Sequence, residues 1–466
     1  MPVAVRRRSS SSFPNLQLLL LPPRLSRAST ISMDPCWAVL DRSVRLVAST
    51  GEKTTGGGSV WDIVVDGVDG NAGEEEEPVG LVGWVREGSV RLAPDLAAPP
   101  MISTLSLHLP ATPLQIAIQL HSVTVMCADK NLLVLFTGPD SFSYASSGHY
   151  LIYDADADTL AVAPPINWRE VRDIFSHVPA IVRRGQGNND FVLALVVRSM
   201  FTREHWLLLW SPGQDRWGWT QKEAKIPAEV LQYAFFTDVS FAFQGSWACW
   251  ADLYFGMLTF NVLSDDQLQF VPLPQAYVME HPPMPRGRPD MHSTIGCVNG
   301  VIKFLTMDGY NDCPGDMVQL NCWSLQAPNL GRWMIDDDNR LFMAELWVDK
   351  TYLKIPVTPR ELPMCPVLSL KEPSMFFFFL SDVDDEDGNF MVKGEYVFSL
   401  NMQSRKVQSW SKCPPGRSLE FIPRLIATEL CAYPPRMHDQ EIDTQKQAKD
   451  IVRGNVTRVK REGAEH

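Results

Sequence analysis

Short apolar segments separated by polar turns run through most of the chain. Residues 247–274, WACWADLYFGMLTFNVLSDDQLQFVPLP, illustrate the pattern. We interpret them as one apolar strand, a polar turn at 264–266 and a second strand that ends at Pro274. Turn residues let the chain reverse, and a proline ends the pairing because it has no N–H to donate. The pattern therefore predicts antiparallel hairpins.

A unit of this kind occurs five times, each as an apolar strand, a few polar residues and a strand that often leads to proline. The five units are residues 149–165, 204–227, 254–274, 319–336 and 395–415. Further strands precede several of them, and Asn299-Gly300 between two apolar runs predicts a two-residue turn with positive φ. Three to four strands per unit, repeated at roughly 50 to 75 residues, predict an all-β, β-propeller-like array of antiparallel hairpins or four-stranded units.

The segments around these units are less regular. Residues 37–47 predict a first strand pair with a bend at Asp41-Arg42, and residues 228–233 predict a turn or two of helix. The glycine-rich residues 51–59 and the acidic residues 70–77 are typical of solvated loops. We therefore expect little helix in the body of the protein.

The two ends of the chain differ in composition from the rest. Residues 1–33 contain five Arg and no acidic residue, which is typical of an organelle transit peptide; a disordered leader, or translation that begins at Met33, are the alternatives. Residues 436–466 are highly charged and lack aromatic rings, which indicates a disordered tail or a frayed helix. We thus expect a leader (1–33), a single large domain (34–435) and a charged tail (436–466).

Composition narrows the class of function. The formal net charge of −12 argues against nucleic acid or an anionic membrane as the main partner, because phosphate groups need clustered cations. No apolar run approaches the length of a membrane span. The nine Cys are scattered without a C-x-x-C pair, as is typical of reduced thiols in a soluble intracellular protein. The expected location is the cytoplasm or nucleus, or a chloroplast or mitochondrion if residues 1–33 are a transit peptide.

No sequence motif for catalysis, cofactor binding or metal binding is found. The nucleophile-elbow pattern is absent, and residues 185–190 begin like a dinucleotide loop but end in Asp without a βαβ context. The acidic residues 154–165 and 383–394 do not have the ligand spacing of an EF-hand loop. We expect no enzyme activity, no cofactor and no metal, although propeller enzymes assemble their sites from residues far apart in sequence.

Several segments together resemble a known family. They are WAVLDRSVRL (37–46), WADLYFGML (250–258), LQFVPLP (268–274), residues 288–305 and WSL (323–325). These segments are similar to the plant proteins, greatly expanded in grasses, that carry domain of unknown function 1618; the specific part covers 247–325. The hairpins are also similar to those of F-box-associated and kelch-type propellers, which bind proteins. The resemblance implies an uncharacterised plant protein and provides no catalytic residues.

We expect a non-catalytic protein–protein interaction module, because propeller loops present variable surfaces on a rigid framework. The candidate loops are 282–291, 308–315 and 381–389, with the candidate partner-binding residues Arg286, Arg288, Asp290, His292, Asp308 and Tyr310. The residues expected to be structural are Trp250, Asp252, Tyr254, Pro272 and Gly300. The alternative is a propeller that binds, or hydrolyses, a small molecule or glycan in a central pocket. A centre filled with apolar side chains would exclude that alternative.

Overall fold

A computed structural model of the protein describes residues 37–48, 81–110, 122–138, 148–166, 171–173, 178–185, 190–199, 204–212, 218–231, 235–264, 267–278, 286–326, 330–335, 340–386, 389–414 and 422–430. The predicted leader and tail, and the segments 51–59 and 70–77, lie outside the described residues. Parts of the candidate loops 282–291 and 381–389 also lie outside them.

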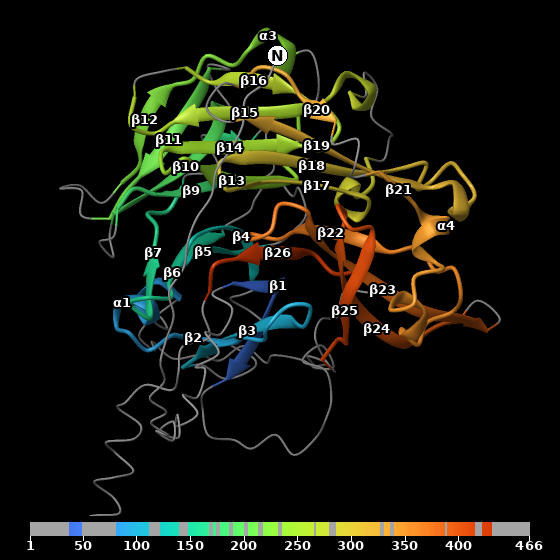
Figure 1. Ribbon diagram of the computed structural model, residues 1–466. Helices are drawn as coiled ribbons and strands as arrows, with labels where there is room; N and C mark the ends of the chain where they lie inside the picture. Colours follow the sequence, from blue (N-terminus) through green and yellow to red (C-terminus); the bar gives the residue numbers. More distant parts are fainter. Residues whose placement is uncertain are drawn as a thin grey trace, which may run out of the picture. The chain divides into compact units, whose positions relative to one another are not determined.

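Antiparallel strands form most of the described structure, which confirms the predicted all-β fold (Figure 1). Five sheets are each built from consecutive strands. Sheet B contains β4 (Thr124–Asp129), β5 (Leu132–Thr137), β6 (His149–Asp154) and β7 (Thr159–Val162). Sheet C contains β8 (Val171–Asp173) and β9 (Ala180–Arg183), which both pair with β10 (Phe191–Ser199), then β11 (His205–Trp210) and β12 (Thr220–Glu223).

Sheets D, E and F come next along the chain, and in each of them the first strand is the innermost. Sheet D contains β13 (Val239–Phe243), β14 (Trp247–Asp252), β15 (Gly256–Asn261) and β16 (Gln269–Pro272). Sheet E contains β17 (Ser293–Val298), β18 (Val301–Asp308), β19 (Gln319–Gln326) and β20 (Met334–Ile335), and β21 (Leu341–Phe342) also pairs with β19. Sheet F contains β22 (Met364–Leu368), β23 (Met375–Glu386), β24 (Asn389–Asn401) and β25 (Lys406–Lys412).

Sheet A is different, because it combines strands from both ends of the described chain. Its order is β26 (Leu425–Thr428), β1 (Ala38–Ala48), β3 (Ile102–Leu109) and β2 (Arg91–Asp95). Strand β26 is antiparallel to β1, whereas β1 and β3 are parallel. A single residue pair, Ser43 with Thr124, joins sheet A to sheet B.

Short helices connect the strands. They are α1 (Leu81–Arg86), α3 (Ala228–Leu231) and α4 (Met343–Leu346), with 3₁₀ turns η1 (Gln275–Tyr277), η2 (Pro289–Met291), η3 (Gly315–Met317) and η5 (Tyr352–Lys354). The predicted helical turn at 228–233 corresponds to α3.

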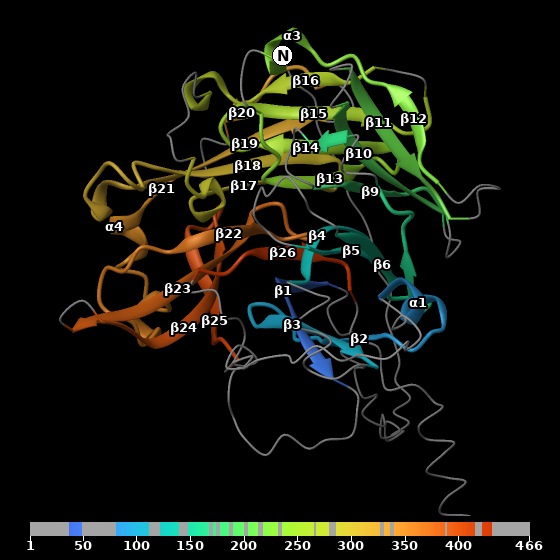
Figure 2. The ribbon, with the colours of Figure 1, turned by 180° about the vertical axis from the view of Figure 1, so that it is seen from behind.

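The six sheets follow one another as the blades of a propeller do (Figures 1 and 2). The innermost strands, in the order β26, β4, β9, β13, β17 and β22, each contact the next, and β22 contacts β26 again. Among the described residues, one apolar cluster lies between each neighbouring pair of sheets. The cluster between sheets F and A contains Phe379 of β23 and Val39 of β1, so this last contact closes the series.

Each of the five predicted hairpins forms two consecutive outer strands of one sheet, B to F. The interpretation of 247–274 as two strands was wrong, because the apolar stretch turns back at residues 253–255 and forms both β14 and β15. The Asp252 carboxylate accepts the Tyr254 N–H at this turn. A Cβ at Gly256 of β15 would lie 2.4 Å from the Val271 carbonyl of β16, so only glycine at this position allows the two strands to pair this closely.

Residues 37–47 also differ from the prediction, because they form one strand and not a strand pair. The register of β1 against β3 shifts between Leu40 and Val44, which places the predicted bend at Asp41-Arg42 inside the strand. The bend exists because β1 changes its partner there, from β26 to β4. The predicted turn at Asn299-Gly300 is confirmed, with φ of 51° and 76°.

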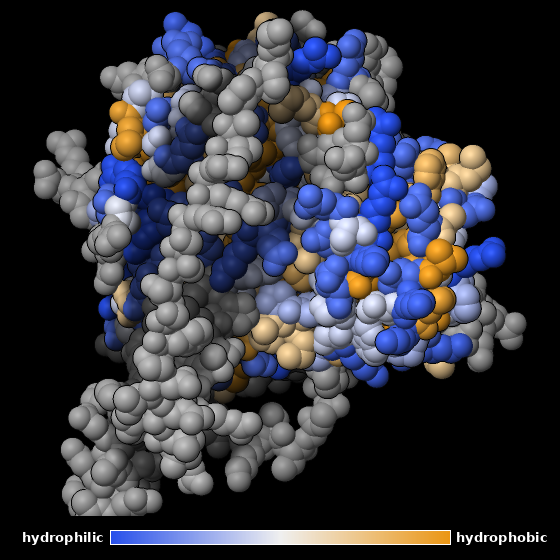
Figure 3. All heavy atoms as spheres, viewed as in Figure 1, coloured by the Kyte–Doolittle hydropathy of each residue, from blue (hydrophilic) through white to orange (hydrophobic). Residues whose placement is uncertain are grey.

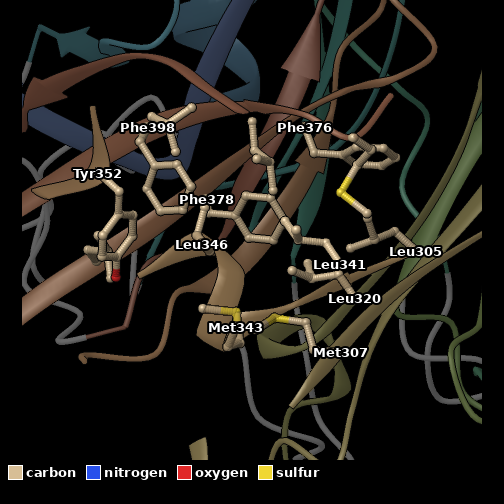
Figure 4. Packing of buried hydrophobic residues seen from close by; sticks show 14 of the residues in the cluster. Leu305, Met307, Leu320, Leu341, Met343, Leu346, Tyr352, Phe376, Phe378 and Phe398 are labelled. Carbon is tan, nitrogen blue, oxygen red and sulfur yellow. The ribbon is translucent and has the colours of Figure 1, made fainter. Parts of the chain in front are cut away.

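The cluster between sheets E and F is rich in aromatic rings. The rings of Phe378 and Phe398 stack with centroids 5.4 Å apart, and Tyr352 packs edge-on against Phe398 at 5.5 Å (Figure 4). Met343 and Leu346 of α4 enter the same cluster. The connection that carries α4 and η5 is therefore anchored in the core between the two sheets.

Candidate functional site

The connections that follow β14, β16 and β18 meet on one side of sheets D and E. We call this side the loop face; it comprises residues 252–256, 273–278, 286–292 and 308–319. The Tyr254 hydroxyl donates to the Arg286 carbonyl, and the Tyr277 hydroxyl donates to Asp308, so these connections are bonded to one another. All six predicted partner-binding residues lie on this face.

Arg286 is held between two carboxylates and two aromatic rings. Its Nη2 lies 2.6 Å from Asp238 Oδ2 and 2.9 Å from Asp252 Oδ1. Its guanidinium carbon lies 4.9 Å from the ring centroid of Phe236 and 4.8 Å from that of Tyr254. This arrangement fixes the beginning of the 286–292 connection against sheet D.

Strand pairing brings the two carboxylates together. Asp238 precedes β13 and Asp252 ends β14, next to the pair formed by Val239 and Ala251. Asp252 also accepts the N–H of Phe236, and Asp238 accepts the N–H of Leu253. Asp238 was not among the predicted residues, because a single Asp before a strand carries no signal in the sequence.

One guanidinium facing two buried carboxyl groups changes their ionisation. Burial, with the neighbouring charge of Asp252, raises the pKa of Asp238 to about 8, although Arg286 opposes the rise. Burial also raises the pKa of Asp252, against the hydrogen bonds from Arg286 and two backbone N–H groups. The pair therefore retains a proton near neutral pH.

The structure brings Arg288 together with Asp290. Two bonds of 3.2 and 2.6 Å join the guanidinium to the carboxylate, and Arg288 also donates to the carbonyls of Ile422 and Pro423. Those two carbonyls precede β26, so Arg288 connects the loop face of sheet E to the strand that completes sheet A.

His292 and Tyr310 form a second pair, with ring centroids 5.7 Å apart. His292 Nδ1 lies 3.1 Å from Ser293 Oγ. Burial lowers the pKa of His292, which Asp290 opposes, and burial raises the pKa of Tyr310 to about 12. Both side chains are therefore uncharged at neutral pH.

Asp308 lies apart from these pairs. Its Oδ2 accepts from the Tyr277 hydroxyl at 2.7 Å and from Asn321 Nδ2 at 2.6 Å. Burial, together with Asp308, raises the pKa of Tyr277 to about 12. Like Arg286 and Arg288, Asp308 is thus engaged by groups of its own chain.

The five residues expected to be structural lie in or beside sheets D and E. Trp250 is fully buried, and Asp252 and Tyr254 belong to the Arg286 cluster described above. The Pro272 carbonyl accepts from Trp333 Nε1 at 2.8 Å. Gly300 lies in the turn between β17 and β18.

An apolar surface lies beside the polar clusters of the loop face. The segments 309–318 and 340–363, which we call the loop-face insert, carry η3, β21, α4 and η5. Its inward residues Val318, Met343, Leu346 and Tyr352 are buried, whereas four large apolar side chains point outward: Met317, Phe342, Val348 and Leu353. Val348 and Leu353 are 72% and 67% exposed. Packing of α4 against η3, and the bond from the Met343 N–H to the Val318 carbonyl, place Met317 near Phe342.

The insert also carries exposed charged side chains of both signs. The exposed charged residues of the insert include Asp312, Asp316, Glu345, Lys350 and Lys354. Figure 3 shows hydrophobic residues among hydrophilic ones on the side of the molecule where Figure 1 places α4. Sequence reasoning missed this surface, because the apolar residues of the insert do not alternate in a way that separates its inner from its outer side.

A cavity of about 190 Å³ lies between the innermost strands. Its walls come from β4, β13, β17, β22 and β26, and most of its lining side chains are apolar, among them Phe241, Ile295, Val367 and Ile426. The polar lining residues are Arg42, Asp129, Lys130, Ser240, Thr294, Thr428 and Glu429. The centre is therefore neither filled nor lined mainly by polar groups.

Two features are absent from the described residues. These residues contain no group of three or more His, Cys, Asp or Glu placed to hold a metal ion. They also contain no helix of the length and hydrophobicity that crossing a membrane requires.

Comparison with solved structures gives matches at very low sequence identity. The β-propeller domain of the Trilobed protease from Pyrococcus furiosus is 6% identical, with a TM-score of 0.29 over 61% of this chain and 72% of that one. The exo-inulinase from Aspergillus awamori is 10% identical, with a TM-score of 0.30 over 63% of this chain and 64% of that one. The tricorn protease is 9% identical, with a TM-score of 0.27 over 63% of this chain and 29% of that one.

Sequence comparison matches the chain to one family model and to no curated protein. Residues 250–377, which contain most of sheet D, sheet E and the loop-face insert, match the model of a family described as "Protein of unknown function (DUF1618)".

Proposed function

We propose that the protein is a non-catalytic module that binds another protein through the loop-face insert. The observation that carries the proposal is the two-sided packing of the insert. Its inner side is buried between sheets E and F, and its outer side exposes Met317, Phe342, Val348 and Leu353. Because scattered single apolar residues are ordinary on a protein surface, it is the occurrence of four on the outer side of one insert that indicates an interface.

The surroundings of the four residues favour a protein as the partner. An apolar centre with a rim of mixed charge is typical of protein–protein interfaces. A nucleic acid or an anionic membrane would require clustered cations, whereas Asp312, Asp316 and Glu345 lie among the exposed charges here. The polar clusters built on Arg286, Arg288 and Asp308 support the same role by holding the neighbouring connections in place.

Affinity purification with matched variants tests the proposal. In the test variant, Val348→Lys and Leu353→Lys are combined, which places two charges on the apolar surface. The control is Leu263→Lys, because Leu263 is 65% exposed but lies in the turn after β15, outside the insert. We expect a partner that is retained by the unaltered protein and the control and that is lost from the double variant. Equal recovery of every partner by the double variant, with unchanged unfolding, would contradict the proposal.

A further inference from the structure

We propose that the central cavity is a binding site for one small, uncharged and mainly apolar organic molecule, about the size of a substituted benzene ring. This site is separate from the loop-face insert and does not depend on the function proposed for that surface. The argument rests on the volume of the cavity, its opening, its walls and the state of its charged groups.

The volume suits a single small molecule. An engineered apolar cavity of about 150 Å³ in another protein holds one benzene molecule, and this cavity measures about 190 Å³. Drug-sized ligands occupy pockets of roughly 300 Å³ or more. A ligand of about eight to ten non-hydrogen atoms is therefore the appropriate size, which excludes a glycan chain.

The cavity is open to solvent. Lys130 and Glu429 line it and are both exposed, so its mouth lies at the turn between β4 and β5 and at the end of β26. Farther in, Phe241, Gly296 and Ala427 are only half-buried, although they belong to innermost strands. In a centre packed with side chains these residues would be buried completely.

The walls favour an apolar ligand over water. Apolar residues make up most of the lining, and most of these apolar residues belong to β13, β17, β22 and β26. Ordered water needs two to four polar partners, which the apolar part of the lining does not supply. A compact apolar molecule removes both its own surface and the surface of the walls from water.

Two of the four charged residues that line the cavity, Arg42 and Asp129, are hydrogen-bonded to backbone groups of the protein. Arg42 donates from Nε to the Val125 carbonyl at 2.6 Å and from Nη2 to the Met126 carbonyl at 2.9 Å. Asp129 Oδ2 accepts the Arg183 N–H at 2.7 Å. Two acidic and two basic side chains line the cavity, so its formal charges cancel. A ligand with a net charge would lose hydration without gaining a dedicated partner.

Gly296 provides a way to fill the cavity. A Cβ at this position would lie 3.5 Å from Leu368 Cδ2, an ordinary contact with another lining residue. A valine there would therefore project into the cavity without striking the backbone. The matched control is Gly218→Val, because nothing lies within 4 Å of a Cβ at Gly218 and this residue is not part of the lining.

The test is a titration of the purified protein with benzyl alcohol, benzylammonium and benzoate, which share one shape and differ in charge. Binding is followed by ligand-observed NMR and by the shift of the thermal unfolding temperature. We expect saturable binding of benzyl alcohol with a Kd on the order of 1 mM, and binding of the two ions weaker by about tenfold or more. Gly296→Val is expected to weaken the binding of benzyl alcohol at least about tenfold, whereas Gly218→Val should leave this affinity unchanged.

Three results would overturn the inference. They are the absence of saturable binding of benzyl alcohol, undiminished binding to Gly296→Val, and tighter binding of either ion than of the alcohol. Should Gly296→Val fail to fold, Ala427→Val on β26 serves as a second filling variant with the same expected result. Because the inserted lysines of the Val348→Lys, Leu353→Lys variant lie outside the cavity, that variant should bind benzyl alcohol normally.

Discussion

Sheets D and A have the same number of strands but are encoded in opposite ways. Sheet D is one continuous stretch, in which each strand pairs with the next through a short connection. Sheet A pairs β1 with β26, almost the full length of the described chain away, and includes the parallel pair β1 and β3. Local sequence therefore specifies sheet D, whereas sheet A forms only once the rest of the chain has brought its ends together.

Removal of β26 should cause the largest loss of stability. Truncation after Arg424 deletes the strand that pairs with residues 38–41 and leaves the cluster between sheets F and A open. We expect the loss of more than about 5 kcal/mol of unfolding free energy, enough to abolish a cooperative thermal transition. Truncation after Leu430 keeps β26 and is the control. If the chain truncated after Arg424 still showed a cooperative transition at an unchanged temperature, sheet A would not need β26.

Core substitutions compare the two sheets directly. Trp250 of sheet D and Leu40 of sheet A are both fully buried. Trp250→Ala should destabilise by about 3 to 5 kcal/mol and Leu40→Ala by about 2 to 5 kcal/mol, because each leaves a cavity. Urea unfolding measures both values. A cost below about 1 kcal/mol for Leu40→Ala would mean that sheet A is packed loosely, contrary to its burial.

Arg42 stabilises the junction between sheets A and B. Its backbone N–H donates to the Arg424 carbonyl, and its side chain donates to two carbonyls of β4. Arg42→Met keeps most of the apolar stem but removes the side-chain bonds, so we expect a loss of about 1 to 3 kcal/mol in urea unfolding. Arg45→Met on the exposed side of the same strand should change stability by less than about 0.5 kcal/mol.

The Arg286 cluster gives sheet D a pH dependence. The pKa of Asp238 rises from 3.8 to about 8 on folding, so between these values the folded protein binds a proton that the unfolded chain releases. Stability therefore falls as pH rises from about 4 to about 8, by at most about 1.4 kcal/mol per pH unit for one proton. Asp238→Asn should flatten the curve between pH 6 and 8.

Asp129→Asn is the control for that measurement. Burial raises the pKa of Asp129 to about 6, so this substitution should alter the slope only below that pH. If the unfolding free energy of Asp238→Asn changed with pH between 6 and 8 as steeply as that of the unaltered protein, the Arg286 cluster would not be the cause of the pH dependence.

The turn between β13 and β14 should give the smallest effect. Gly245 has a φ of 68°, and nothing lies within 4 Å of a Cβ there, so Gly245→Ala introduces backbone strain and no clash. We expect a loss of about 1 kcal/mol in thermal or urea unfolding. Gly218→Ala, at a glycine without positive φ and with equal space, should be nearly neutral.

The sequence was most informative where structure is local. Paired apolar runs around polar turns predicted the outer two strands of sheets B to F, and Asn299-Gly300 predicted its turn, because both depend on neighbouring residues. The three-residue turn at 253–255 was missed, since Leu253, Tyr254 and Phe255 are apolar and the turn depends on the Asp252 carboxylate. Sheet A was missed because the partner of β1 lies at the other end of the domain.

The site was less predictable than the fold. The six candidate residues lie on one set of connections, but no sequence pattern showed that Arg286 faces Asp238 or that Arg288 reaches residues 422 and 423. The outward side of the insert and the central cavity depend on which side chains are left uncovered after folding. That information exists only in three dimensions.

The pairing of β1 with β26 also has a consequence during protein synthesis. A ribosome produces β1 before the other described strands and β26 after them, so β1 has an edge without its native neighbour while the strands in between are made. The blades encoded in between can assemble in order as they emerge, but the ring cannot be sealed until residue 428 has left the exit tunnel. A chain that ends after sheet F but before β26 has five complete sheets and leaves an edge of β1 unpaired, and an unpaired strand edge favours aggregation.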